Sequence, residues 1–527
     1  MRRENSIQVK NTNGIALCIV AIMYKTIDVL TRRYIGDIVD NSANVNIYVV
    51  LVICILTIIF QYMLPFANSK FEALYTSELY TKIESAVLSS KQSELEKKNI
   101  GEISTCFTSD VNGLLQFAKR KLTIFLPDLV SFILCVFLLM KMKLSLGILT
   151  MIVGVVSAFF MTKLSKNMIS KMNDYQNKLK EINKLTSDGL INVEMIKVNL
   201  LGKQLVEQYG MELNRLQTLK KKIAFRQAIL SAPSMVLSFA TLGTIAFYGG
   251  YCVYNNQLSM GSLLAAIMMA DYIVSPIMRF ENTLVQYRRS KVNQNNVSKI
   301  IEMQYENENI EYFVYSDDFS TKDVLFAYSD NRTIFNELNI RFEAGKINYI
   351  VGNNGIGKST LIKLLTGVYE IEKGAINLPI KFNTLSDIRN KISVMTQDSL
   401  LFSDTIRNNI LVDNICSEEK LNTLCKSIGL DSEINKIENG YNTFLQENGN
   451  PLSGGQKKRI NFLRCVLREA NVYIFDEPTV NIDSSNVQVM MDYILSLSKK
   501  HYVVVITHDK EIITKYPGKI HEIMGGK

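Results

Sequence analysis

The sequence predicts a chain of two parts, a bundle of long apolar helices followed by an α/β domain with a parallel sheet. Three observations predict this division. The chain has 527 residues, which is too many for one ordinary hydrophobic core. Its mean hydropathy of +0.08 is high for a soluble protein, and its longest apolar runs lie in the N-terminal part. After Glu302 the composition changes to polar residues with short strand and helix patterns.

The N-terminal part contains stretches that are apolar enough to cross a membrane, for which about 20 such residues are needed. Two connections between them, 68–121 and 162–230, are long and rich in lysine, whereas the others are short. The basic bias places both long connections and both termini in the cytoplasm, and we expect the long connections to form helical stalks. The predicted spans are 14–40, 48–64, 122–140, 144–161, 229–254 and 260–280.

Charged residues within the spans allow two interpretations. Lys25, Asp28 and Arg32 are spaced so that they share one face of the first span, and Asp128 and Asp271 lie in the third and sixth spans. They could form a ladder of ion pairs, or they could line a polar pathway through the membrane. The sequence leaves both interpretations open.

The formal net charge of +9 also has two interpretations. Nucleic-acid binding would use such an excess, but basic cytoplasmic loops of a membrane protein explain it as well, and the apolar spans favour the second. The eight cysteines form no C-x-x-C pair, and the three histidines lie at no metal-binding spacing from them. Neither a disulfide framework nor a zinc site is predicted.

The C-terminal part contains a glycine-rich loop between a predicted strand, 340–352, and a predicted helix start, 359–368. From Gly352 the loop fits G-x-x-x-x-G-K-[ST], in which backbone N–H groups at a helix N-terminus converge on phosphates. We expect Lys358 to reach the β- and γ-phosphates of a nucleotide and Ser359 to bind Mg²⁺. The predicted cradle comprises Gly352, Asn353, Asn354, Gly355, Ile356, Gly357, Lys358, Ser359 and Thr360.

Two further strands are predicted to end in polar residues beside this loop. The stretch VYIFDEPT, 472–479, has the pattern of a buried parallel strand with Asp476 and Glu477 at its carboxyl end, where ligands bind in such sheets. Asp476 suits Mg²⁺, and Glu477 is placed to polarise a water that attacks a γ-phosphate. The strand pattern 503–508 ends at His508, which is predicted to contact the γ-phosphate.

A second glycine-rich loop, PLSGGQKKRI, lies at 451–460. Its glycines and Ser453 precede a predicted helix and would also form an anion cradle. One chain therefore carries two such loops, although a single nucleotide needs only the first to hold its phosphates.

These residues, in this order, resemble the ATP-binding cassette (ABC) proteins, and the resemblance covers essentially the whole chain. The stretch LSGGQ is the signature of that family. The resemblance implies that ATP and Mg²⁺ are the cofactors. It also implies that Ser453, Gly454, Gly455 and Gln456 meet the ATP held by a second subunit.

The same resemblance implies roles for three more residues. Tyr328 resembles the aromatic residue that stacks on adenine. Gln397 resembles the glutamine that joins Mg²⁺ to the membrane domain and takes part in catalysis with Glu477 and His508. Asp483 resembles the loop aspartate that crosses the dimer interface.

The membrane part resembles the exporter branch of the family. Residues 97–111 resemble the first intracellular loop of six-span exporters, and 443–456 resemble the exporters' extra loop, in which Glu447 would meet helices from the membrane. The resemblance implies a multi-domain half-transporter. Its parts are an all-α six-helix transmembrane exporter domain over 1–302, a linker over 303–318, and an α/β P-loop ABC ATPase domain over 319–527.

Three features depart from the family pattern. The chain has V-N-I-D ending at Asp483 where S-A-L-D is usual, and Gln446 stands where glycine is common. The short stretch before the first span leaves no room for a peptidase domain, so we expect no trimming of a leader peptide by this chain.

The expected function is that of an ATP-driven exporter, an ATP hydrolase working by alternating access as a dimer in a bacterial plasma membrane. Its ATPase domain would lie in the cytoplasm. The cargo could be a peptide, a lipid or a drug-like compound, with a modified peptide favoured from chain size and residue usage. The second half-transporter is expected to be an identical copy, and no nucleic-acid partner is expected.

Three alternatives stay open from the sequence. The chain could be half of a heterodimeric multidrug or lipid exporter, or a membrane protein gated by ATP without transport. A soluble ABC ATPase acting on DNA or ribosomes would share the second part of the chain, but six apolar spans argue against it.

Overall fold

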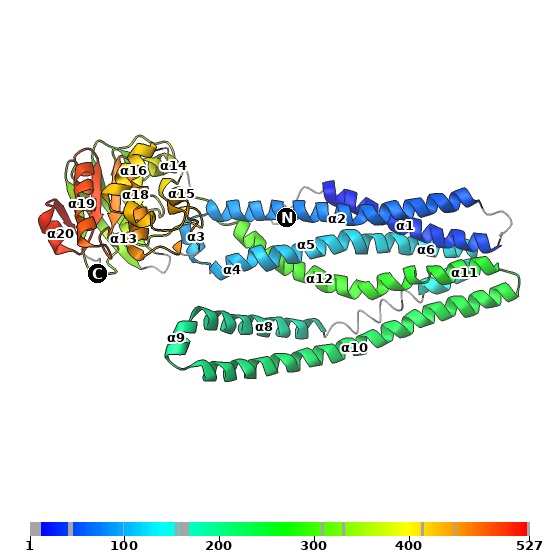
Figure 1. The fold of residues 1–527 in the computed structure, drawn as a ribbon. Coiled ribbons are helices and arrows are strands. Elements are labelled where there is room, and N and C mark those ends of the chain that lie inside the picture. Colours follow the sequence, from blue (N-terminus) through cyan, green and yellow to red (C-terminus); the bar gives the residue numbers. More distant parts are fainter. Residues whose placement is uncertain are drawn as a thin grey trace. The chain divides into compact units, whose positions relative to one another are not determined.

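The computed structural model describes residues 12–40, 46–98, 100–152, 156, 168–306, 310–328, 332–412, 416–446 and 449–523. The chain divides into two compact units (Figure 1). The first, the membrane unit, comprises Met1–Leu88 and Lys98–Met303. The second, the nucleotide-binding unit, comprises Ser89–Lys97 and Gln304–Lys527.

The regular structure described in the membrane unit is helical. The helix α8 packs along α10, and the short α9 joins them at the tip of this hairpin (Figure 1). The elements are α1 (Thr12–Asp40), α2 (Ile47–Leu88), α4 (Ile100–Thr105), η3 (Cys106–Asp110), α5 (Val111–Arg120), η4 (Lys121–Phe125), α6 (Leu126–Met142), α8 (Met168–Ile191), α9 (Val193–Val198), α10 (Gly202–Tyr254), α11 (Met260–Met269) and α12 (Asp271–Ile301).

Four described helices are long and apolar enough to cross a membrane. They are Asn13–Asp40, Ile47–Leu88, Gly101–Met142 and Met260–Ile301, and they contain the first, second, third and sixth predicted spans. The predicted fifth span lies within α10. The predicted fourth span starts as a helix at Leu144, directly after Lys143, and most of its second half lies outside the described residues. One residue, Lys143, therefore separates the helix of the third span from that of the fourth.

The charged residue Asp128 of α6 is buried inside the membrane unit, with 3% of its surface exposed. Its carboxylate lies 3.0 Å from Nζ of Lys25 in α1 and 3.1 Å from Nη1 of Arg279 in α12. A buried charge is stable only when it is compensated in this way. Asp128 thus joins three helices through ion pairs.

The other charges of the first span are also paired. Asp28 lies 3.6 Å from Arg32 and accepts a hydrogen bond from the hydroxyl of Tyr272. Asp271 is exposed at the start of α12. These contacts favour the ion-pair ladder, and the lining of a transport pathway by these residues stays a prediction.

The nucleotide-binding unit contains a five-stranded parallel sheet in the order β6-β7-β8-β4-β9. Parallel strands are buried on both faces and have continuous apolar runs, and every residue of β7 is buried. The strands are β4 (Ile347–Val351), β6 (Ile392–Met395), β7 (Val472–Asp476), β8 (Tyr502–Ile506) and β9 (Lys519–Glu522). The strand predicted within 472–479 is confirmed as β7. The strand predicted over 503–508 is confirmed as β8, which ends at Ile506, two residues before His508.

A second sheet has the order β1-β5-β2-β3, in which β2 is antiparallel to both neighbours. Its strands are β1 (Phe313–Tyr315), β2 (Phe319–Ala327), β3 (Thr333–Phe342) and β5 (Lys373–Leu378). The strand predicted to run into a loop over 340–352 is confirmed as β4, but its predicted start is wrong, because the residues up to Phe342 belong to β3 in a different sheet. A turn separates β3 from β4, and Gly345 takes a φ of +80° there that most residues avoid.

Two apolar cores cover the two faces of the parallel sheet. In β8, Val504 packs with Phe319 and Leu361, whereas its neighbour Val505 packs with Phe462 on the opposite face. The helices of this unit are α3 (Gln92–Glu96), α13 (Lys358–Leu365), α14 (Leu385–Lys391), α15 (Ile406–Leu411), α16 (Glu418–Ser427), α17 (Asp431–Ile434), η5 (Gly440–Asn442), α18 (Gly454–Leu467), α19 (Ser484–Ser498) and α20 (Lys510–Lys515).

Candidate functional site

The loop Gly352–Thr360, here the cradle loop, leads from β4 into α13. Gly357 precedes the helix with a φ of +110°, and a Cβ atom on it would lie 2.5 Å from Cγ2 of Ile334. Only glycine fits both constraints. The strand–loop–helix order that the sequence predicts is confirmed, and the unpaired N–H groups of the first turn of α13 lie where an anion is favoured.

Lys358 is held over this loop. Its Nζ donates to the carbonyl oxygens of Gly352 at 2.7 Å and Asn353 at 3.1 Å, and it lies 2.8 Å from Nε2 of His508. A charged ammonium group has only donors, so Nε2 of His508 is the acceptor in this contact. Four of the predicted residues therefore meet at one point.

Two carboxylates lie at the carboxyl end of β7, as predicted. Asp476 is buried, and the hydroxyl of Ser359 donates to its Oδ2 at 3.3 Å. Burial raises the pKa of Asp476, although the hydrogen bond from Ser359 opposes the shift. Glu477 has a φ of +49°, its backbone N–H donates to the carbonyl of Ile506, and its Oε1 lies 3.5 Å from Nε2 of His508.

The charges of this site act on one another. Burial lowers the pKa of Lys358, while Glu477 and Asp476 oppose that change because they favour a nearby cation. The site therefore contains a desolvated cation beside two carboxylates, an arrangement typical of sites that bind charged ligands.

These residues line one cleft of about 650 Å³. At one end the hydroxyl of Tyr328 lies 2.8 Å from Oγ1 of Thr360, and the tyrosine ring packs edge-on against Tyr369. The lining residues are Tyr328, Arg332, Ile334, Asn354, Gly355, Gly357, Lys358, Ser359, Thr360, Gln397, Asp476, Glu477, Val480 and His508.

Three lining residues were not predicted from the sequence: Arg332, Ile334 and Val480. Arg332 directly precedes β3, and Ile334 is the second residue of that strand. Arg332 could have been predicted as a lining residue, because a basic side chain a few positions after Tyr328 suits a site that binds an anionic nucleotide. Val480 follows the two carboxylates directly but has no chemical feature that would mark it.

The other predicted site residues lie elsewhere in this unit. Of the predicted site residues that the structure describes, those that do not line the cleft are Gly352, Asn353, Ile356, Ser453, Gly454, Gly455, Gln456 and Asp483. Ser453 caps α18, where its hydroxyl accepts from the backbone N–H of Gln456 and the Gln456 side chain accepts from the backbone N–H of Ser453. This reciprocal pair is a capping box.

Asp483 caps the next helix, α19. Its carboxylate accepts hydrogen bonds from Ser485 and Asn486, which lower its pKa to about 2. Glu447, predicted to meet helices from the membrane, lies outside the described residues.

The cleft offers oxygen ligands of the kind that Mg²⁺ prefers. In the described ranges no three His, Cys, Asp or Glu side chains group as a metal site. The hydroxyl of Ser359, the carboxylate of Asp476 and the amide of Gln397 nevertheless line the same cleft. Mg²⁺ commonly uses one or two protein oxygens together with phosphates and water, so these residues fit it.

Two family models match the chain. The model for the ABC transporter transmembrane region matches residues 12–277, and the model for the ABC transporter matches residues 335–480. The match to the transmembrane model excludes the alternative that the chain is a soluble ABC ATPase acting on DNA or ribosomes.

Two relatives match this chain over most of their own length. The chain is 24% identical over 469 residues to an ATP-dependent lipid A-core flippase of Syntrophus aciditrophicus, covering 86% of this chain and 78% of the relative. It is 26% identical over 494 residues to the multidrug resistance-like ATP-binding protein MdlA of Buchnera aphidicola, covering 88% and 82%.

The fold is similar to that of a bacterial Atm1-family ABC exporter solved with ATP bound. The TM-score is 0.79 over 97% of this chain and 93% of the other, at 17% identity.

Proposed function

The chain belongs to the ABC transporter family as a half-transporter that couples ATP hydrolysis to transport, and from this premise we propose a homodimeric exporter working by alternating access. One observation carries the proposal. The cradle loop, both carboxylates and His508 share one cleft, while the loop Leu452–Gln456, here the signature loop, lies outside it. A second copy would bring its signature loop to the open side of this cleft.

Within each cleft, Lys358 would bind the β- and γ-phosphates and Tyr328 would stack on adenine. Glu477 would orient the attacking water. His508 would donate to the γ-phosphate from Nε2 once Lys358 turns to the nucleotide and Nε2 carries the ring proton. The 3.5 Å approach of His508 to Glu477 supports a shared task at the γ-phosphate.

Mg²⁺ would be held by Ser359, Asp476 and Gln397 together with phosphate oxygens. When bound, it would neutralise charge that develops on the phosphates. The burial of Asp476 supports this role, because a desolvated carboxylate gains more from a cation than an exposed one does.

Two apolar surfaces support the assembly of two copies. The helix α9 and the residues next to it leave Val193, Met195, Val198 and Leu200 exposed. The nucleotide-binding unit exposes Leu400, Phe402 and Phe444. Large exposed apolar side chains that gather in one place mark interaction surfaces, and we propose that a second copy covers both.

The cargo is proposed to be an amphiphilic compound: a lipid, a drug-like molecule or a modified peptide. The names of the relatives include a lipid flippase and a multidrug resistance-like protein, which supports a partly apolar cargo. The proposed location is a bacterial plasma membrane with the nucleotide-binding unit in the cytoplasm.

The test is transport by the purified chain alone in lipid vesicles. A fluorescent phospholipid, a cationic dye and a labelled apolar peptide are offered separately, with ATP or with a non-hydrolysable analogue. We expect ATP-dependent movement of at least one probe, and none with E477Q. A chain that hydrolyses ATP but moves no probe would contradict export. Activity that appears only after a different half-transporter is added would contradict the homodimer.

A further inference from the structure

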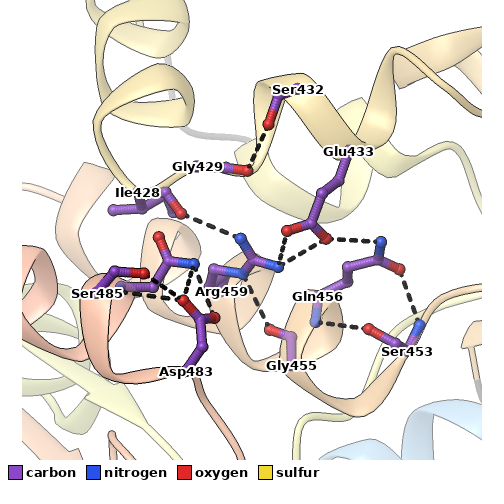
Figure 2. A network of polar contacts seen from close by, with 11 residues as sticks. Ile428, Gly429, Ser432, Glu433, Ser453, Gly455, Gln456, Arg459, Asp483 and Ser485 are labelled. Carbon is purple, nitrogen blue, oxygen red and sulfur yellow. Dashed lines mark hydrogen bonds and ion pairs between the residues drawn. The ribbon is translucent and has the colours of Figure 1, made fainter.

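The signature loop is braced from behind by an ion pair that the hydrolysis mechanism does not use. Figure 2 shows this network, which joins α17 and α18, and beside it a separate group of contacts with Asp483 and Ser485 at the start of α19. Arg459 of α18 is buried, and its Nη2 lies 2.7 Å and 2.8 Å from the two carboxylate oxygens of Glu433 in α17. Its Nη1 donates to the carbonyl of Ile428 at 3.2 Å.

Glu433 connects Arg459 to the signature loop through hydrogen bonds. Its Oε2 accepts a hydrogen bond from Nε2 of Gln456 at 2.9 Å, and Oε1 of Gln456 accepts from the backbone N–H of Ser453 at 2.8 Å (Figure 2). A carboxylate only accepts and a backbone N–H only donates, so the two partners fix which way the Gln456 amide points. Glu433 thereby sets the orientation of Gln456, and Gln456 sets the backbone of Ser453.

This arrangement leaves the Ser453 hydroxyl ready for a ligand. Its oxygen accepts from the backbone N–H of Gln456, which leaves its own O–H free to donate outward. Ser453 and Gly454 are exposed at the N-terminus of α18, a helix of 14 residues. The exposed side of the loop thus offers donors to an anion, while the opposite side is held by Gln456 and Glu433.

The same scaffold contacts the start of α19. Gly429 has a φ of +68°, and a Cβ atom on it would lie 2.8 Å from Oδ1 of Asn486 and 3.5 Å from Nη1 of Arg459. Asn486 in turn donates to Asp483 at 2.8 Å. The start of α19 therefore lies close to Gly429, beside the residues that hold the signature loop.

We propose that Glu433 is a positioning residue for the signature loop: held by Arg459, it fixes Gln456 and so aims the Ser453 hydroxyl at the γ-phosphate of ATP on a second copy. This inference rests on the proposed function, since it requires ATP between two copies. Burial raises the pKa of Glu433, but the hydrogen bonds from Arg459 and Gln456 outweigh it and leave the pKa lowered. Glu433 is thus a carboxylate at neutral pH.

The test compares E433Q with E438Q in the full-length protein in lipid nanodiscs. E438Q removes a nearby exposed carboxylate and is the matched control. An amide at position 433 cannot accept fully from both Arg459 and Gln456. We expect E433Q to lower the turnover number for Mg-ATP about tenfold and E438Q to lower it less than twofold. Binding of ATP by the open state should stay within about twofold of wild type, because the cradle loop is untouched.

A double-mutant cycle separates positioning from folding. Q456E places two carboxylates together and should lower turnover at least as much as E433Q. Combining E433Q with Q456E exchanges donor and acceptor, and a carboxylate at the third helical position still caps the serine. We expect the double variant to recover turnover to within about threefold of wild type.

Two results would overturn this inference. One is equal turnover of E433Q and E438Q. The other is a loss of turnover in the double variant that equals the product of the losses in E433Q and Q456E. Failure of the proposed function would look different. In that case the wild type and E477Q would themselves show no ATP-dependent closed dimer by cross-linking, whatever residue stands at position 433.

Discussion

The cradle loop and the signature loop both begin a helix with glycines, but they are built differently. The cradle loop is completed by its own chain, because Lys358, Asp476 and His508 gather over it in one cleft. In the signature loop the side chain of Gln456 bonds back to Glu433, whereas Ser453 and Gly454 are exposed.

This difference suggests what each loop needs. The cradle loop has the side chains that would hold and hydrolyse a nucleotide, whereas the signature loop offers only backbone N–H groups and one hydroxyl. Such hydrogen-bond donors, without a catalytic group beside them, are useful only against a nucleotide that another site already holds. The comparison therefore supports a machine of two copies, each supplying one loop to the other's ATP.

The largest expected effect is that of E477Q on the cradle side. Loss of the group that orients water should lower ATP turnover about 10³-fold while ATP stays bound, and the closed dimer should accumulate. E511Q, an exposed change in α20, is the control. Steady-state phosphate release checks the rate and cross-linking checks the dimer. Wild-type turnover in E477Q would remove Glu477 from the catalytic role.

The next effect is that of K358A on nucleotide binding itself. Alanine has no group that can contact the phosphates in place of the Lys358 ammonium. The loss of these charged contacts should weaken Mg-ATP binding by roughly 10- to 100-fold. Lys346, an exposed residue of the turn before β4, supplies the control K346A. Equilibrium binding of a fluorescent ATP analogue measures both. Unchanged affinity in K358A would mean that another cation holds the phosphates.

On the signature side, S453A should lower turnover by roughly tenfold, the usual cost of one hydrogen bond to a charged group. ATP binding by the open state should not change, in contrast to K358A. Ser432, whose hydroxyl donates to the carbonyl of Gly429, gives the control S432A. Steady-state measurement of kcat and KM for ATP distinguishes a loss of turnover from a loss of ATP binding. If S453A weakened ATP binding by the open state, the signature loop would contact the ATP that is bound by its own chain.

The smallest expected effect concerns pH. The pKa of Glu433 in the folded chain lies below its ordinary value of 4.5, so its contribution to stability is present above that pH. The contribution is lost as the pH falls through the folded value. Because Glu433 is partly exposed, it amounts to roughly 1 kcal/mol or less. The difference in melting temperature between wild type and E433Q should shrink from neutral pH to about pH 4. A difference that grows on acidification would contradict the ionic brace.

The sequence predicts the cradle side well because its chemistry is local. Lys358 and Ser359 lie within one loop, and Asp476 and Glu477 end one buried strand, so spacing and periodicity suffice to place them. Order along a parallel sheet then brings the loop and the strand ends together. The same reasoning misplaced the start of the strand predicted over 340–352, because an apolar pattern does not show that Gly345 turns the chain into another sheet.

Contacts between distant segments could not be predicted. Glu433 and Gln456 are separated in sequence, and no periodic pattern joins them; their contact depends on how α17 packs against α18. The pairing of Asp128 with Arg279 likewise depends on the packing of α6 and α12. Burial also determines electrostatics that the sequence does not show, such as the raised pKa of Asp476.

The most direct test of the central claim uses dimers of two differently tagged copies in an E477Q background and counts the ATP occluded per dimer. In one dimer, K358A lies on one copy and S453A on the other. In the second, both changes lie on the same copy and its partner has neither. If each ATP lies between the cradle loop of one copy and the signature loop of the other, the first dimer keeps one intact site and the second keeps none. Occlusion by the second dimer alone would show that both loops serve the same chain's ATP and would contradict the account.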